Sequence, residues 1–101
     1  MSTQPMNTYA IFRRNAWQTP QDLQEAAARS TQVGNEEMPD RVRWIRSYVV
    51  ADTTGQLGTV CIYQATDPGA IQEHAGRADL PADEVLPVMD TVIVRADPVA
   101  S

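Results

Sequence analysis

Two runs of β-branched and aromatic residues, separated by a short turn, constrain the fold of this chain most strongly. The runs are Arg43–Asp52 and Gly58–Ala65, and the residues Thr53–Gln56 between them have the composition of a turn. Strands joined by so short a connection pair in antiparallel fashion, so the sequence predicts a β-hairpin. Residues 67–78 follow, and their opening aspartate and proline predict the N-terminus of a helix.

The first part of the chain predicts one further strand and one further helix. Residues 7–13 alternate between apolar and polar side chains, as a half-buried strand does. Thr19 and Pro20 are residue types that begin helices, and Gly34 is a suitable stop for a helix that ends at about Val33. Four residues spaced by three and four form a narrow inner stripe that lets the helix lie close to a sheet. They are Leu23, Ala26, Ala27 and Ser30.

A last apolar run, Val88–Arg95, predicts a final strand because it is rich in β-branched residues. A turn-like segment bracketed by Pro81 and Pro87 precedes it. The predicted order β-α-β-β-α-β is the ferredoxin-like arrangement, with a four-stranded antiparallel sheet and both helices on one face. We therefore expect one α+β domain over residues 1–101, with flexible ends at residues 1–6 and 96–101.

Both faces of the predicted sheet are apolar, although two helices cover only one of them. Strict alternation divides the second strand into two sets: Val42, Trp44, Tyr48 and Val50 on one face, and Ile45 and Val49 on the other. An uncovered apolar face is larger than the patch that a monomer normally exposes, so we expect a homodimer. The alternative is that these side chains are singly exposed without consequence.

Short motifs between Trp44 and Val85 relate the chain to a known family. They are Trp-x-x-Ser-Tyr-Val, Cys-x-Tyr, an Asp-Pro cap, His-Ala in the helix and Leu-Pro-x-Asp after it. This part of the chain resembles a family of small bacterial dimeric α+β-barrel proteins of largely unknown function, which includes nickel-binding members. The resemblance implies a dimeric α+β barrel and makes nickel the candidate metal. Such barrels also include cofactor-free oxygenases and isomerases, so no single activity is implied.

Composition disfavours several classes of function. The net charge is −5 and all eight basic residues are arginines, so we expect no basic face for nucleic acid. We expect a cytoplasmic protein without a membrane partner, because no stretch approaches the roughly 20 apolar residues of a membrane helix. The single cysteine excludes a disulfide framework and a four-cysteine zinc site. Motifs for ATP, NAD and serine-hydrolase chemistry are absent.

Four side chains are candidates for ligand or metal binding: His74, Cys61, Tyr48 and Tyr63. His74, the only histidine, lies on or beside the helix stripe that faces the sheet, where it serves either chemistry or the core. A buried, unreactive thiol is the favoured interpretation of Cys61, and a soft two-ligand metal site arises if it shares a face with His74. The two tyrosines either line an apolar pocket or belong to the core or an interface.

Three hypotheses for the function follow. The first is a small-ligand or transition-metal binding protein without established catalysis, with His74 as the metal ligand and nickel as the metal that the resemblance suggests. One histidine departs from the several imidazoles that nickel favours. The second is a cofactor-free enzyme of oxygenase or isomerase type, in which His74 moves a proton and Tyr48 or Tyr63 orients an oxygen atom. The third is an interaction module whose cavity is filled by its own side chains.

Overall fold

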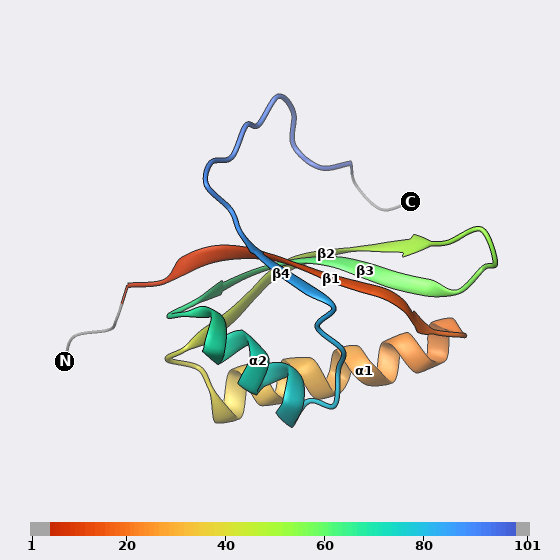
Figure 1. The fold of residues 1–101 in the computed structure, drawn as a ribbon, viewed down its shortest axis with the longest axis horizontal. Coiled ribbons are helices and arrows are strands. Elements are labelled where there is room, and N and C mark those ends of the chain that lie inside the picture. Colours follow the sequence, from red (N-terminus) through yellow and green to blue (C-terminus); the bar gives the residue numbers. More distant parts are fainter. Residues whose placement is uncertain (1–4, 99–101) are drawn as a thin grey trace.

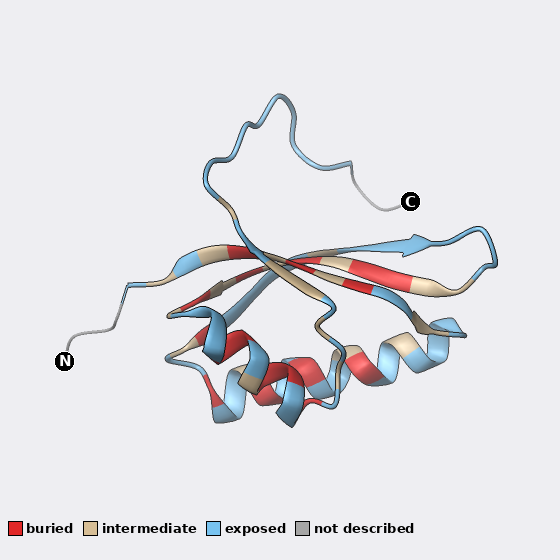
Figure 2. Cartoon of the chain, viewed as in Figure 1, coloured by how far each residue is buried: buried red, intermediate tan, exposed pale blue. Residues whose placement is uncertain are grey.

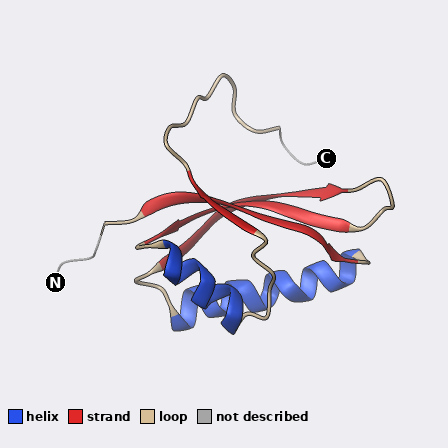
Figure 3. Cartoon of the chain, in the orientation of Figure 1, coloured by secondary structure: helices blue, strands red, loops and turns tan. Residues whose placement is uncertain are grey.

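The computed structural model describes residues 5–98 and places two α-helices on one face of a four-stranded sheet (Figure 1). The elements in chain order are β1 (Asn7–Trp17), α1 (Pro20–Gln32), the π-helical turn η1 (Val33–Glu37), β2 (Val42–Ala51), β3 (Leu57–Ala65), α2 (Pro68–Arg77) and β4 (Glu84–Pro87). The strands are antiparallel in the order β2-β3-β1-β4. This arrangement confirms the predicted ferredoxin-like α+β fold (Figure 3).

Both helices begin where the sequence predicts. The Thr19 hydroxyl accepts a hydrogen bond from the Asp22 amide at 3.1 Å, and the Asp67 carboxylate accepts one from the Ala70 amide at 2.8 Å. Such caps each contribute about 1 kcal/mol by satisfying amides that the first turn leaves free. Within residues 5–98, no helix has the length and apolar character needed to span a membrane. The cytoplasmic location stays a prediction.

The last strand lies earlier in the chain than predicted. Val88–Arg95 is not a strand; β4 lies within the segment predicted to be turn-like, and there Val85 pairs with Ile11 of β1 and packs against the core. The first residues to reach the free edge of β1 after α2 form the strand, and the β-branched run beyond them leaves the sheet (Figure 1). β-branched residues favour strands because their side chains pack well on the pleated surface of a sheet. In the single chain Val88–Arg95 has no such surface to pack on, so its composition was misleading.

A β-bulge reverses the predicted faces of half of β2. The register with β3 shifts between Trp44 and Arg46, so Ile45 has no partner across the ladder. Val49 then pairs with a residue on the helix side of β3, whereas Tyr48 turns to the open face. Because side chains alternate with a period of two, one inserted residue exchanges the faces of all that follow. The prediction from strict alternation was therefore wrong for three side chains: Tyr48, Val49 and Val50.

The core lies between the sheet and the two helices (Figure 2). Ile11 and Tyr63 from the sheet and Ile71 from α2 are at most 1 % exposed. Ala26 and Ser30 of α1 are buried, as the predicted inner stripe requires. In the described part of the chain no helix lies over the opposite face of the sheet, so the two faces have different surroundings.

The predicted flexible ends fall partly outside the described residues, which exclude residues 1–4 and 99–101. Asp97, which belongs to the predicted C-terminal loose end, is in contact with the sheet. Its carboxylate accepts a hydrogen bond from the Tyr48 hydroxyl at 2.8 Å and pairs with Arg46 of β2. The chain after β4 thus runs over the open face of the sheet and is bonded to it near its far end (Figure 1).

Candidate functional site

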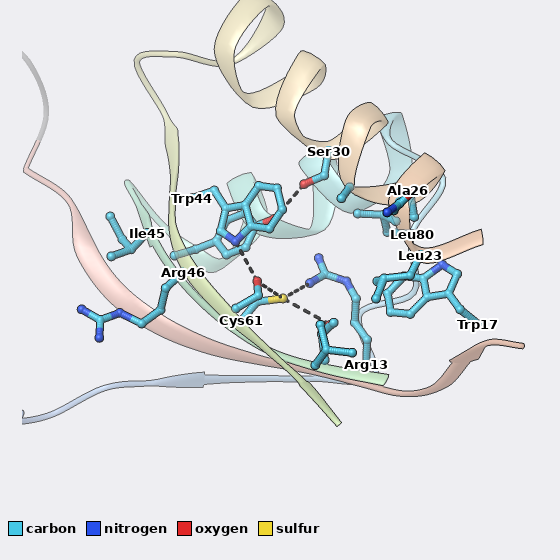
Figure 4. A pocket seen from close by; sticks show the side chains of 16 residues that line it. Arg13, Trp17, Leu23, Ala26, Ser30, Trp44, Ile45, Arg46, Cys61 and Leu80 are labelled. Carbon is cyan, nitrogen blue, oxygen red and sulfur yellow. Dashed lines mark hydrogen bonds between the residues drawn. The ribbon is translucent and has the colours of Figure 1, made fainter. Parts of the chain in front are cut away.

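A pocket of about 510 Å³ lies between α1 and the sheet, next to the bulge of β2 (Figure 4). Trp17 at the end of β1 and Trp44 of β2 contribute aromatic walls, and Leu23 and Ala26 of α1 contribute aliphatic ones, together with Leu80. The small side chains of the inner stripe leave space over this part of the sheet. Pockets of this size and apolar character commonly bind small organic molecules.

An irregularity in β1 positions two residues of this pocket. The register of β1 with β3 shifts between Arg13 and Trp17, and Asn15 between them has a left-handed backbone with φ of 52°. Gly58 of β3 lies against this irregularity, and a Cβ atom there would collide with the Arg13 carbonyl oxygen. A glycine is therefore required at this position for β1 to approach β3 as closely as it does.

Polar groups meet at the sheet side of the pocket around the sulfur of Cys61 (Figure 4). Nη1 of Arg13 donates a hydrogen bond to this sulfur at 3.1 Å, and the Ser47 hydroxyl donates another at 3.0 Å. The thiol in turn donates to the Thr59 hydroxyl at 3.3 Å. Cys61 is 3 % exposed, so the burial that the sequence predicts for this thiol is confirmed.

Arg13 was not among the predicted site residues, yet its side chain is the most heavily buried cationic group that the structure describes. It is 2 % exposed, and its Nε donates to the Pro81 carbonyl at 2.6 Å. Its Nη2 has no hydrogen-bond partner within residues 5–98. The signal in the sequence was its inward position: Tyr9, Ile11 and Arg13 alternate on the covered face of β1.

His74 lies on the inner face of α2 and is 1 % exposed. Its Nε2 is 3.0 Å from the Ser30 carbonyl oxygen, which only accepts, so we assign the proton to Nε2 and leave Nδ1 as an acceptor. Nδ1 has no partner in the described part of the chain. Burial is the main cause that lowers the pKa of His74, and the charge of Arg13 lowers it further. The imidazole is therefore neutral near pH 7.

Tyr63 of β3 lies between His74 and the pocket. Its ring meets the imidazole edge-on at a centroid distance of 5.4 Å, and its hydroxyl is 2.8 Å from the Ser30 hydroxyl. Trp44 stacks on Tyr63 with 6.0 Å between the ring centroids. Burial, the largest effect, raises the pKa of Tyr63, so the residue stays a neutral phenol.

The four predicted site residues do not meet in one pocket. Cys61 and Tyr63 line the 510 Å³ pocket, whereas His74 borders a separate hollow of about 120 Å³ that Tyr63 also lines. Tyr48 lies on the open face of the sheet because of the bulge, where it is bonded to Asp97. The structure therefore separates Tyr48 from the other three and does not pair Cys61 with His74.

A metal centre is not assembled by the described residues alone. Within residues 5–98, no group of three or more histidine, cysteine, aspartate or glutamate side chains is close enough to hold a metal ion. His74 supplies one bare nitrogen, and its polar neighbours are the carbonyl of Ser30 and the ring of Tyr63. These groups do not make the set of imidazole or thiolate ligands that nickel favours.

Comparisons with known proteins agree with the fold. Residues 9–88 match the model of the family described as nickel responsive protein SCO4226-like, which confirms the resemblance seen in residues 44–85. The crystal structure of SCO4226 from Streptomyces coelicolor A3(2) is similar with a TM-score of 0.66 and 21% sequence identity, and the match covers 84% of this chain and 99% of that chain. At this identity the likeness supports the fold alone. A search of curated proteins gives no match.

Proposed function

We propose that this chain, which belongs to the SCO4226-like family of nickel-responsive proteins, is a binding protein that takes a small organic molecule between α1 and the sheet. The observation that carries this proposal is the pocket of about 510 Å³. Its volume falls within the range of about 300–1,000 Å³ that is typical of small-molecule sites. An interaction module with a cavity filled by its own side chains is a weaker explanation of the same space.

Binding without catalysis is favoured over the enzyme hypothesis by the positions of the candidate acid and base. A general acid or base must reach the proton that it transfers. His74 borders the smaller hollow, and Tyr48 lies on the opposite face of the sheet. The Tyr63 hydroxyl lies within hydrogen-bond distance of the Ser30 hydroxyl. The pocket thus lacks the pairing of histidine and free phenol on which the enzyme hypothesis depends.

Tryptophan fluorescence tests this proposal directly, because both tryptophans of the chain, Trp17 and Trp44, line the pocket. We expect the neutral probe N-phenyl-1-naphthylamine to quench their emission on binding. Ala27→Phe adds a ring to the pocket lining and should weaken binding at least tenfold. Ala28→Phe makes the same change at the next, exposed position of α1 and serves as the control. Equal binding by both variants would exclude this pocket as the site.

We also propose that the protein is a homodimer formed through the open face of the sheet. Tyr48, Val50 and Leu86 are 43–48 % exposed on this face. The segment after β4 adds four large apolar side chains that are 76–89 % exposed: Met89, Val92, Ile93 and Val94. Apolar groups gathered in this way are typical of protein–protein contacts. Two copies that pack open face to open face bury them and form the dimeric α+β barrel that the sequence predicts.

Sedimentation velocity on two variants of β2 tests the dimer. Val50→Glu places a charge on the open face and should shift the protein to monomer, because the interface would bury that charge. Val49→Glu changes the neighbouring residue, which is 56 % exposed but faces the helix side, and should leave the dimer intact. A wild-type protein that sediments as a monomer at micromolar concentration contradicts the proposal.

Nickel binding through His74 is the second candidate function. The description of the family and the bare, neutral Nδ1 of His74 support it, although the described residues do not complete a site around this atom. If His74 is a ligand, calorimetric titration with nickel chloride should show binding that His74→Ala abolishes and Cys61→Ala retains. Affinity should fall only below pH 6.5, because the pKa of His74 is lowered and its imidazole ligates when neutral. Unchanged affinity in His74→Ala rules out this residue as a ligand.

A further inference from the structure

We propose that the ligand of the 510 Å³ pocket is a small monocarboxylate with an apolar, aromatic body, and that Arg13 recognises its carboxylate group. This inference rests on the proposed binding function and names the chemical class that the pocket accepts. It is carried by three features of the pocket: a buried cation without an anionic partner, a free donor on that cation, and aromatic walls beside it.

The first feature is the charge of Arg13. Within residues 5–98, no carboxylate lies within ion-pair distance of it, although the arginines that do have carboxylate partners are 42–59 % exposed along their side chains. They are Arg14, Arg41, Arg46 and Arg77. Four exposed arginines thus have carboxylate partners, whereas the buried Arg13 has none in the described part of the chain. A buried charge is strongly disfavoured unless it is paired, so an anion in the pocket would stabilise this arrangement.

The second feature is the orientation of the guanidinium. The Pro81 carbonyl accepts from Nε at 2.6 Å and the Cys61 sulfur accepts from Nη1 at 3.1 Å, which holds the planar group in place. Nη2 is left with two hydrogens and no acceptor in the described chain. The guanidinium of Arg13 rises from β1 toward the interior of the pocket in Figure 4. This buried donor therefore lacks an acceptor, which a ligand oxygen that reaches it would supply.

The amount of charge in the pocket indicates a monoanion. Arg46 is the other cationic residue of the lining, but it pairs with Asp97 on the open face and its side chain points away from the pocket (Figure 4). One uncompensated cation matches one carboxylate. A phosphate dianion carries more charge and three acceptor oxygens. The remaining polar groups near Cys61 are the neutral hydroxyls of Ser47 and Thr59, so this part of the pocket offers no second positive charge to a phosphate.

The third feature is the aromatic wall. Trp44 is held by its stacking on Tyr63 at an interplanar angle of 14°, and its indole nitrogen donates to Ser47 at 2.7 Å. Trp17 and Leu23 stand on the other side of the pocket (Figure 4). Aromatic pairs are stabilised beyond the area that they bury, so a ring between these walls is favoured over an aliphatic chain.

Calorimetric titration with a matched pair of compounds tests the inference on the whole chain. 2-Naphthoate and 2-naphthamide share one aromatic body and differ in charge. We expect the wild-type protein to bind the acid at least tenfold more tightly than the amide. Arg13→Met should remove this preference by weakening the acid alone, whereas Arg14→Met changes the exposed neighbour and should retain it.

Each outcome has a definite meaning, and the wild-type comparison decides even if Arg13→Met does not fold. Equal affinity for the acid and the amide, or a preference for the acid that survives in Arg13→Met, overturns the inference. If N-phenyl-1-naphthylamine still binds in an Ala27-dependent way, such a result leaves the proposed binding function intact. If neither the neutral probe nor 2-naphthoate binds in the pocket, both proposals fail.

Discussion

The two faces of the sheet carry similar residue types and give them different properties. Tyr63 on the helix side is 1 % exposed and contacts Ser30, whereas Tyr48 on the open side is 43 % exposed and bonds Asp97. Burial raises the pKa of the first phenol. The second phenol donates to Asp97, and this hydrogen bond is the largest cause that lowers the pKa of that carboxyl. The covered face holds the pocket, and the open face is the surface through which we propose that the protein dimerises.

The largest expected contrast between the faces is in the response to side-chain truncation. Ile11→Ala removes atoms from a side chain that is 0 % exposed and should lower the free energy of unfolding by about 2–5 kcal/mol. Val50→Ala on the open face should cost less than about 0.5 kcal/mol where the protein is monomeric. Urea unfolding at several protein concentrations measures both. A cost for Val50→Ala that grows with concentration supports burial of the open face in a dimer.

The hydroxyl groups of the two tyrosines provide a second contrast. Tyr63→Phe leaves the buried Ser30 hydroxyl without this partner, and we expect a loss of about 1–3 kcal/mol in the free energy of unfolding. Tyr48→Phe removes an exposed hydrogen bond to Asp97 and should change stability by less than about 0.5 kcal/mol. Thermal unfolding at pH 7 compares them. Similar losses in the two variants would show that the faces do not differ as the burial indicates.

The smallest expected effect is the pH dependence of the covered face. The folded pKa of His74 is lowered, so the unfolded chain binds its proton first as the pH falls below 6.5. Stability should therefore decrease on acidification, by at most about 1.4 kcal/mol per pH unit for one proton. Urea unfolding between pH 7.5 and 5.5 checks this, with His74→Gln as the comparison because the chain has one histidine. A wild-type slope that persists unchanged in this variant assigns it to other groups.

The sequence predicted the faces of some candidate side chains correctly and not those of others. The inward alternation along β3 is regular, so Cys61 and Tyr63 lie on the helix side as their spacing requires. Tyr48 was misplaced because a bulge has no signal in the residue types that surround it. Arg13 was not considered because an arginine on a strand is usually solvated. Its alternation with Tyr9 and Ile11 indicated the covered face, but the packing of α1 and Leu80 around β1 was needed to show that it is enclosed.

The sequence by itself determined the elements whose stability is local. Thr19 and Asp67 cap their helices through contacts with residues three positions away, and the turn between β2 and β3 joins neighbouring strands. These interactions depend on residues that are close in the chain, so composition and spacing are enough to predict them.

Tertiary structure alone decided which segment became β4, which way Tyr48 faces and that Arg13 is buried beside a pocket. Each of these depends on contacts between residues far apart in the chain. β4 forms where the free edge of β1 is reached, the bulge adjusts β2 to β3, and Arg13 is enclosed by groups from β3, α1 and the segment before β4. Local residue types carry little information about such contacts, because they form only when the whole sheet and its helices pack together.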